Sequence, residues 1–228
     1  MNKPKIVIAP SLLSADMSNL GGELKRIEDA GCEWVHIDLF DGRFAPNLSF
    51  GPKTVSDLRR RTELFLDVHL MLFDPLPWAE RFASAGADQI TVHLEAGGET
   101  ASVLEAIRAA GCRAGLALKP DAPAEAPFPY LDQIDLLLPM TVYPGFSGQR
   151  FLPEVVPKIA QARDEIERRG LQVRIQADGG VSTKTAPELA RAGVSAFVAG
   201  SALFGSNNLA AAAADIRQAA ANAQRKAP

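Results

Sequence analysis

The sequence predicts an α/β fold, a single (β/α)8 TIM barrel that spans residues 1–228 as one domain. Three observations lead to this prediction. Short apolar runs with strand character occur eight times, amphipathic segments with helical spacing separate most of them, and Ala-Gly pairs precede several of the runs. A chain of 228 residues, 47% of them hydrophobic, can bury one large core and has the length of one such barrel.

The strands are read from continuous apolar runs, which are typical of parallel strands buried on both faces. In chain order they are Ile6–Ala9, Trp34–Asp38, Leu64–Leu70, Gln89–His93, Arg113–Leu118, Ile134–Met140, Gln172–Ala177 and Ala196–Ala199.

Between the strands, apolar residues recur at helical spacing. This spacing predicts helices over Leu20–Ala30, Pro75–Ala85, Glu99–Ala110 and Pro153–Arg169, and the alanine-rich segment from Leu209 to Ala223 predicts the last helix. Prolines 120, 123, 127 and 129 interrupt the segment after the fifth strand, so we expect an irregular connection there. Gly31, Gly86, Gly111 and Gly193 each follow an alanine, where a left-handed residue would end a helix.

Composition narrows the class of partner. Lys and Arg number 24 against 27 Asp and Glu, and this net charge of −3 lacks the basic excess that nucleic acid or an anionic membrane would need. We expect a small-molecule partner. The N-terminus lacks signal-peptide features and no apolar run approaches the ~20 residues that span a bilayer, so we expect a cytoplasmic protein. Cys32 and Cys112 are expected to be buried, reduced thiols.

Four potential metal ligands lie at the ends of predicted strands. They are His36, Asp38, His69 and Asp178. His36 and Asp38 are two apart and so share one strand face, and active sites of these barrels lie at the carboxyl ends of the strands. Imidazole and carboxylate ligands suit zinc, iron, manganese or cobalt, so we expect one divalent ion. A lone histidine in an apolar strand is more often a hydrogen-bonded core residue, and we read His93 in that way.

Two further segments suggest ligand contacts. Gly179-Gly180 follows the seventh strand and Gly200-Ser201 the eighth, the positions that bind phosphate in many barrels, and a short helix near Ala202 would add its dipole. The alternative is that these glycines only make tight turns. The loop of residues 141–150 contains glycines that could hinge a lid, although Pro144-Gly145 is also a common turn dipeptide.

These segments together resemble the ribulose-phosphate 3-epimerase family over nearly the whole chain. The resemblance is carried by Ala9-Pro10-Ser11, the run His36–Gly42 with Pro46-Asn47, Asp67–Met71, Pro144–Gln149, Asp178-Gly179-Gly180 and Gly200-Ser201. The Asp-Gly/Pro-Asn loop and the Pro-Gly-Phe-x-Gly-Gln loop are the specific motifs, and their shared order is the strong signal.

The resemblance implies a metal-dependent D-ribulose 5-phosphate 3-epimerase of the pentose phosphate pathway. The ion would be held by the four ligands above, with Asp38 and Asp178 transferring protons on opposite faces of C-3 through a metal-stabilised enediolate. The resemblance also implies a homo-oligomer. Expected substrate contacts are Ser11, His69, Met71, Met140, Gly145, Phe146, Ser147, Gly148, Gly179, Gly180, Gly200 and Ser201.

Some positions depart from the family pattern and leave alternatives open. Phe40 replaces a methionine of the apolar collar, and Arg43, Thr141, Tyr143 and Gln176 are also unusual. Phe40 and Tyr143 could reshape the pocket for a ketohexose 6-phosphate such as D-allulose 6-phosphate. A non-catalytic phosphosugar-binding barrel is a different reading, as is an aldolase or hydrolase. For the Schiff-base route only Lys119 stands at a strand end.

Overall fold

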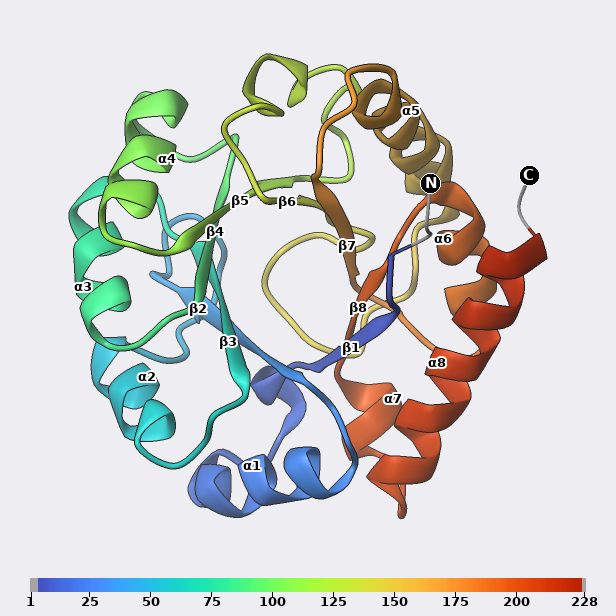
Figure 1. Cartoon of the computed structure of the whole chain (residues 1–228). Coiled ribbons are helices and arrows are strands. Elements are labelled where there is room, and N and C mark those ends of the chain that lie inside the picture. Colours follow the sequence, from blue (N-terminus) through green and yellow to red (C-terminus); the bar gives the residue numbers. More distant parts are fainter. Residues whose placement is uncertain (1–3, 227–228) are drawn as a thin grey trace.

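The computed structural model describes residues 4–226 and has eight parallel strands enclosed by helices (Figure 1). The strands are β1 (Val7–Pro10), β2 (Trp34–Phe40), β3 (Phe65–Met71), β4 (Gln89–His93), β5 (Arg113–Leu118), β6 (Leu136–Pro139), β7 (Arg174–Asp178) and β8 (Ala196–Ala199). The (β/α)8 barrel expected from the sequence is confirmed, and the strand ends differ from the expected ones by two residues at most. Residues 1–3 and 227–228 of the predicted domain lie outside the described residues.

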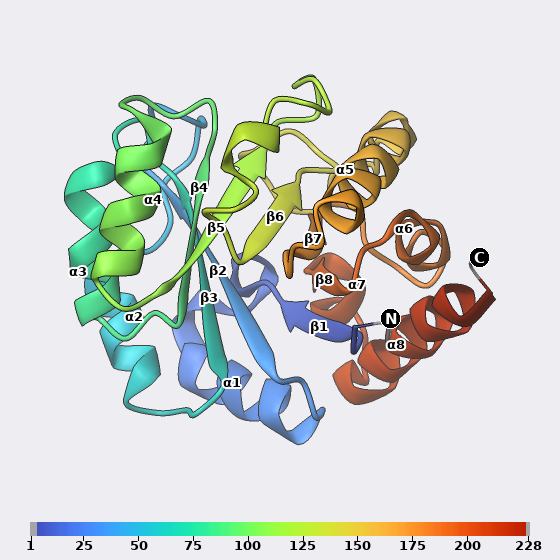
Figure 2. The ribbon, with the colours of Figure 1, turned by 45° about the horizontal axis from the view of Figure 1, so that its top comes forward.

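Helices surround the barrel (Figure 2). They are α1 (Leu20–Asp29), α2 (Pro52–Arg59), α3 (Ala79–Ser84), α4 (Thr100–Ala109), α5 (Val156–Arg168), α6 (Ala186–Ala192), α7 (Ser201–Phe204) and α8 (Leu209–Lys226). Short 3-10 helices are η1 (Leu12–Ser14), η2 (Met17–Asn19), η3 (Leu76–Trp78), η4 (Phe128–Tyr130) and η5 (Pro153–Val155). The proline-rich segment between β5 and β6 contains only η4, which confirms the irregular connection expected there.

The helix ends also follow the sequence. Gly31, Gly86, Gly111 and Gly193 all have positive φ, between 66° and 116°, as a left-handed residue after a helix requires. A side chain at Gly86 or Gly193 would also meet the stem of an arginine on the neighbouring helix. Glycine is therefore needed at these two turns for both backbone and packing reasons.

The sheet closes between β1 and β2. The strands are hydrogen-bonded in the order β1-β8-β7-β6-β5-β4-β3-β2, and a parallel bridge between Ser11 and His36 joins the two ends. The backbone N–H of Ser11 donates to the carbonyl of Ala199 in β8. Ser11 therefore lies where the first, second and last strands meet at the carboxyl end of the barrel.

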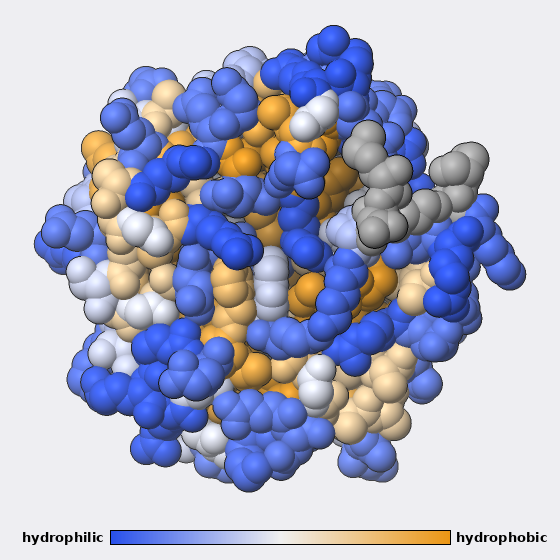
Figure 3. Space-filling model, in the orientation of Figure 1, coloured by the Kyte–Doolittle hydropathy of each residue, from blue (hydrophilic) through white to orange (hydrophobic). Residues whose placement is uncertain are grey.

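Apolar side chains form an outer and an inner layer. The outer layer packs between strands and helices and includes Ile8, Val35, Leu104 and Phe197. The inner layer fills the barrel from residues such as Val7, Leu136 and Leu138. On the face seen in Figure 3, hydrophilic side chains cover much of the periphery and apolar surface shows between them. Among residues 4–226, no helix is long and apolar enough to cross a membrane.

Both cysteines are free and buried, as expected, with Cys32 4% and Cys112 8% exposed. Burial raises the pKa of each thiol from 9.0 to about 11. We therefore expect iodoacetamide at pH 8 to alkylate the folded protein slowly, since the thiolate fraction falls by about 100-fold, and to alkylate the urea-unfolded chain quickly. Mass spectrometry of a time course measures this difference. Equal rates in both states would show that the thiols are accessible.

The same shift makes the stability of the protein depend on pH. In the unfolded chain the thiols ionise near pH 9, whereas in the fold they stay protonated up to about pH 11. Their contribution is therefore fully present below pH 9 and is lost as the pH rises toward 11.

Candidate active site

The four predicted ligands converge at the carboxyl end of the barrel. His36 and Asp38 come from β2, His69 from β3 and Asp178 from β7, and one ligand atom of each lies within 4.8 Å of the others. Parallel pairing puts Asp38 directly beside His69, and the period of two along β2 puts His36 on the same face as Asp38. The structure therefore brings together residues that are up to 142 positions apart, from 36 to 178.

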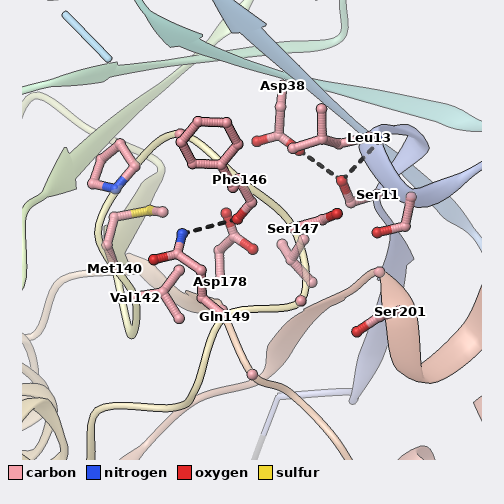
Figure 4. A pocket seen from close by; sticks show the side chains of 18 of the residues that line it. Ser11, Leu13, Asp38, Met140, Val142, Phe146, Ser147, Gln149, Asp178 and Ser201 are labelled. Carbon is pink, nitrogen blue, oxygen red and sulfur yellow. Dashed lines mark hydrogen bonds between the residues drawn. The ribbon is translucent and has the colours of Figure 1, made fainter. Parts of the chain in front are cut away.

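Asp38 is the centre of this cluster. Its Oδ1 lies 3.1 Å from His36 Nε2 and 3.1 Å from His69 Nδ1. Its Oδ2 accepts a 2.6 Å hydrogen bond from the Ser11 hydroxyl (Figure 4). The carboxylate of Asp178 approaches from the other side, with Oδ2 3.9 Å from His36 Nε2. Ser11 thus holds one oxygen of Asp38 and leaves the other directed at the two imidazoles.

A buried carboxylate, Asp67 of β3, supports His36 from below. Its Oδ2 accepts from His36 Nδ1 at 2.8 Å and from Gln176 Nε2 at 2.6 Å, and its Oδ1 accepts from Gln89 Nε2 at 2.8 Å. The donated Nδ1 proton directs the remaining nitrogen, Nε2, toward Asp38. This role of Asp67 could not be predicted from the sequence, where the one signal is that the residue shares a strand face with His69.

His69 has a second partner, His93 of β4. Their Nε2 atoms lie 3.0 Å apart, and His93 Nδ1 lies 3.2 Å from Glu95 Oε2. His93 is thus a hydrogen-bonded core residue, as expected, but its partner is one of the four candidate ligands. Burial lowers the pKa of both imidazoles, that of His93 to about 4, so both are neutral near pH 7.

The charge of the cluster fits a cation. Burial opposes a charge on His36, but Asp38 and Asp67 outweigh it and raise the pKa of this imidazole well above 6.5. Burial, together with repulsion from Asp38, raises the pKa of Asp178 to about 7. The carboxylates thus attract positive charge to this point. Two imidazole nitrogens and carboxylate oxygens are also the donor set that zinc, iron, manganese or cobalt accepts, so the residues present could hold one divalent ion.

A cavity opens directly above Asp38 and Asp178 (Figure 4). Of the expected substrate contacts, His69 lies in the cluster and the others line this cavity: Ser11, Met71, Met140, Gly145, Phe146, Ser147, Gly148, Gly179, Gly180, Gly200 and Ser201. Phe40 and Tyr143, the two residues that could alter the pocket, line it as well. Sequence segments from the ends of six strands, β1, β2, β3, β6, β7 and β8, therefore surround one space.

No other residue fits at either of the two positions after β7, Gly179 and Gly180. Gly179 has a φ of +117°, and a side chain there would lie 2.8 Å from the backbone nitrogen of Val142. Gly180 has a φ of +62°, and its side chain would meet the backbone of Phe151 at 2.8 Å. Tight turns thus require these two residues, as the alternative interpretation held. The same turns border the cavity beside Ser201, where α7 begins one residue before the expected position.

The loop after β6 crosses the cavity mouth. Gln149 Nε2 donates to the carbonyls of Tyr143 and Phe146, at 2.7 and 2.8 Å, and so closes the loop on itself. Asn47, from the loop after β2, donates its Nδ2 hydrogen to the carbonyl of Gly145 at 2.7 Å. Phe146 is nevertheless 57% exposed. The loop is therefore held by a few polar contacts and has a large apolar side chain in solvent.

We expect Asn47→Ala to loosen this loop. The substitution removes the hydrogen bond to the Gly145 carbonyl. Since one hydrogen bond contributes about 0.5–1.5 kcal/mol, amide hydrogen exchange in residues 143–149 should become about 2- to 10-fold faster. Hydrogen exchange with mass spectrometry measures this. Asn222→Ala, on the exposed side of α8, is the matched control, and an unchanged rate in Asn47→Ala would contradict the role of the bond.

Comparison with known proteins agrees with the family resemblance found in the sequence. Residues 7–204 match the model of the ribulose-phosphate 3 epimerase family. The chain is 46% identical to a ribulose-phosphate 3-epimerase from Synechocystis sp., and the alignment covers 93% of both chains. It is 42% identical to a ribulose-phosphate 3-epimerase from Bacillus subtilis, and that alignment covers 93% of this chain and 98% of the relative.

Among solved structures, the fold resembles KGPDC from Streptococcus mutans, with a TM-score of 0.71 and 18% identity over 96% of this chain and 99% of that one. It also resembles a 3-hexulose-6-phosphate synthase, with a TM-score of 0.69 and 22% identity over 95% of this chain and 99% of that one. At these identities the likeness concerns the fold alone.

Proposed function

Because the chain belongs to the ribulose-phosphate 3-epimerase family, whose named members are isomerases, we propose that it interconverts D-ribulose 5-phosphate and D-xylulose 5-phosphate. The observation that carries this proposal is the pair Asp38 and Asp178 facing one cavity above two histidines. Residues 1–228 would act as one catalytic domain, in the pentose phosphate pathway that the name of the relatives implies.

The residues that would hold the divalent ion are His36, Asp38, His69 and Asp178. When bound, the ion would supply Lewis-acid stabilisation of the negative charge that develops on the sugar oxygens. The protein's own contribution is to orient these ligands. Ser11 fixes Asp38 and Asp67 fixes His36, each through a hydrogen bond of 2.8 Å or less.

Proton transfer at C-3 is assigned to the two carboxylates. Asp38 comes from β2 and Asp178 from β7, three strand positions apart around the closed barrel, and both face the cavity (Figure 4). A sugar between them would present opposite faces to the two groups. One carboxylate takes the C-3 proton and the other, protonated, returns a proton from the far side, so the configuration inverts.

The remaining cavity residues are assigned to binding. The turns at Gly179-Gly180 and Gly200-Ser201 border the cavity after β7 and β8, which supports phosphate binding by their backbone N–H groups. Phe40 and Met71 pack together with Ala45 beside the cluster, and Met140 lies across the cavity. These apolar side chains would exclude water from the reacting carbon.

The test is exchange of the C-3 proton in deuterated water, measured together with epimer formation. Ribulose 5-phosphate and allulose 6-phosphate are compared, each with added metal and with chelator. We expect exchange and epimerisation with metal, a loss of at least about 100-fold with chelator, and a higher kcat/KM for the pentulose. No exchange with either sugar would overturn the proposal in favour of a binding barrel.

The same assay addresses the alternatives. A preference for the hexulose would assign specificity to Phe40 and Tyr143, which both line the cavity. An aldolase with a Schiff base has no support in the described residues, since no lysine lines the cavity and the Lys119 ammonium lies 4.3 Å from the centre of the Phe44 ring.

We also propose that the protein forms a homo-oligomer, as expected from the family resemblance. Leu48 is 73% exposed and Phe73 40% exposed, which supports a contact through the loops after β2 and β3. Light scattering on the purified protein measures the oligomeric state. The cytoplasmic location expected from the sequence stays a prediction.

A further inference from the structure

Four side chains form a continuous row from the candidate metal centre to the end of β4. Asp38 Oδ1 lies 3.1 Å from His69 Nδ1, His69 Nε2 lies 3.0 Å from His93 Nε2, and His93 Nδ1 lies 3.2 Å from Glu95 Oε2. His69 and His93 are fully or almost fully buried. The row therefore has three contacts, with a carboxylate at each end and two imidazoles between.

Proton counting restricts how these contacts are made. An ionised carboxylate only accepts, and a neutral imidazole has one N–H and one bare nitrogen. Two neutral imidazoles thus supply two protons to three contacts, and one contact is left without a proton. The middle contact needs one, because two bare nitrogens 3.0 Å apart would repel each other. The contact without a proton is therefore at one end of the row.

A cation in the cluster determines which end this is. His69 can ligate through Nδ1 only if that nitrogen is bare, so its proton must be on Nε2. His69 Nε2–H then donates to His93 Nε2, which leaves the His93 proton on Nδ1, facing Glu95. No imidazole proton has to leave the row for the ligand nitrogen to become free.

The carboxylate of Glu95 is held in a position to accept a hydrogen bond from His93 Nδ1–H. Its other oxygen, Oε1, accepts a 2.8 Å hydrogen bond from the backbone N–H of Lys119. The ring of Phe44 lies against His93, with centroids 4.7 Å apart, and the His69 and His93 rings stack at 5.1 Å. The imidazole of His93 is thus enclosed between two rings and its tautomer is set by the atoms at its two nitrogens.

We propose that His93 and Glu95 are positioning residues that hold His69 in the tautomer with a bare Nδ1 directed at the metal centre. They act as the counterpart of Asp67, which does the same for His36. Through these contacts the exposed residue Glu95 determines which ring nitrogen of the buried residue His69 carries the proton. The proposal rests on the metal centre of the proposed function and is independent of the reaction catalysed there.

The decisive variant is Glu95→Gln. Because the Lys119 N–H has to meet an oxygen, the amide of the new residue would be oriented with its NH₂ group toward His93 Nδ1. That nitrogen must then accept, so the protons of the row reverse: His93 would carry its proton on Nε2 and His69 on Nδ1. The substitution keeps the shape of the side chain and changes the direction of the hydrogen bonds.

Two measurements test the proposal on the full-length protein. The sequence has three histidines, so ¹⁵N-detected imidazole spectra of the zinc-loaded protein contain three ring systems. Competition with a chelator gives the affinity for Zn²⁺ alone. We expect His93 to be the Nδ1–H tautomer in the unsubstituted protein, and Glu95→Gln to weaken Zn²⁺ binding by about 10- to 100-fold.

Glu99→Gln is the matched control, since Glu99 caps α4 four residues farther along and its side chain bonds to Ala101 and Ser102. It should leave both the tautomers and the Zn²⁺ affinity unchanged. The proposal is overturned if His93 has its proton on Nε2 in the unsubstituted protein, or if Glu95→Gln leaves its tautomer and the affinity as they were. Should Glu95→Gln not fold, the spectrum of the unsubstituted protein alone decides. Lack of epimerase activity with the expected tautomers would overturn the proposed function only.

Discussion

Asp178→Asn is expected to lower turnover by about 10²- to 10⁴-fold, and Asp38→Asn by a similar factor. Each substitution removes a proposed acid-base group that faces the cavity and one of the four candidate metal ligands. Rates of epimer formation, measured alongside the bound metal content, separate a lost proton transfer from a lost ion. Asp164→Asn is the matched control, because this carboxylate is exposed and pairs with the adjacent Arg163, away from the cavity.

The two variants should also differ from each other. With one carboxylate left, only the epimer whose C-3 proton faces that carboxylate can exchange with deuterated water, and it should do so without inversion. Asp38→Asn and Asp178→Asn should therefore retain exchange for opposite epimers. Turnover near that of the unsubstituted protein in both variants would falsify the assignment of two carboxylates.

The largest expected loss of stability is that of Asp67→Ala. Asp67 is fully buried and accepts hydrogen bonds from His36, Gln89 and Gln176. Its removal leaves three buried donors without an acceptor. Removing one partner of a buried charged pair costs about 3–5 kcal/mol, and we expect a loss of this size in the free energy of unfolding. Urea denaturation followed by circular dichroism measures it.

Asp57→Ala is the control for this experiment. Asp57 lies on α2, where its partly exposed carboxylate pairs with Lys53 and Arg60. Exposed pairs of this kind contribute at most about 1 kcal/mol. If the two variants lose the same stability, the three hydrogen bonds to Asp67 do not have the importance assigned to them.

The fold could be predicted because the barrel repeats one local pattern. Each strand is an apolar run buried on both faces, and several of the helices that precede a strand end at a glycine, as at Gly31 and Gly193. Such signals are local, so they can be recognised in the sequence without knowing which strands and helices pack beside them. The strands that begin at Leu136 and Arg174 each start two residues later than predicted, because pairing with an adjacent strand determines where a strand begins and ends.

The four candidate ligands could be predicted from a rule about position, since carboxyl ends of parallel strands meet at one end of a barrel. The partners of those ligands could not. Gln176 reaches Asp67 across 109 residues, and the contact depends on the stagger between β3 and β7. The same holds for His93, whose sequence environment resembles an ordinary core strand. Its contact with His69 depends on the register of β3 and β4.

The hydrogen bond between Ser11 and Ala199 has a consequence for synthesis on the ribosome. The backbone N–H of Ser11 is held by the carbonyl of Ala199 in β8, which is translated 188 residues later, from 11 to 199. Until β8 has emerged, β1 lacks its pairing partner and Ser11 is not fixed beside Asp38. A nascent chain therefore has three of the four candidate ligands, His36, Asp38 and His69, long before it has Asp178 of β7 and the β8 strand that follows. The four candidate ligands can therefore be held together only after the chain through β8 has been made.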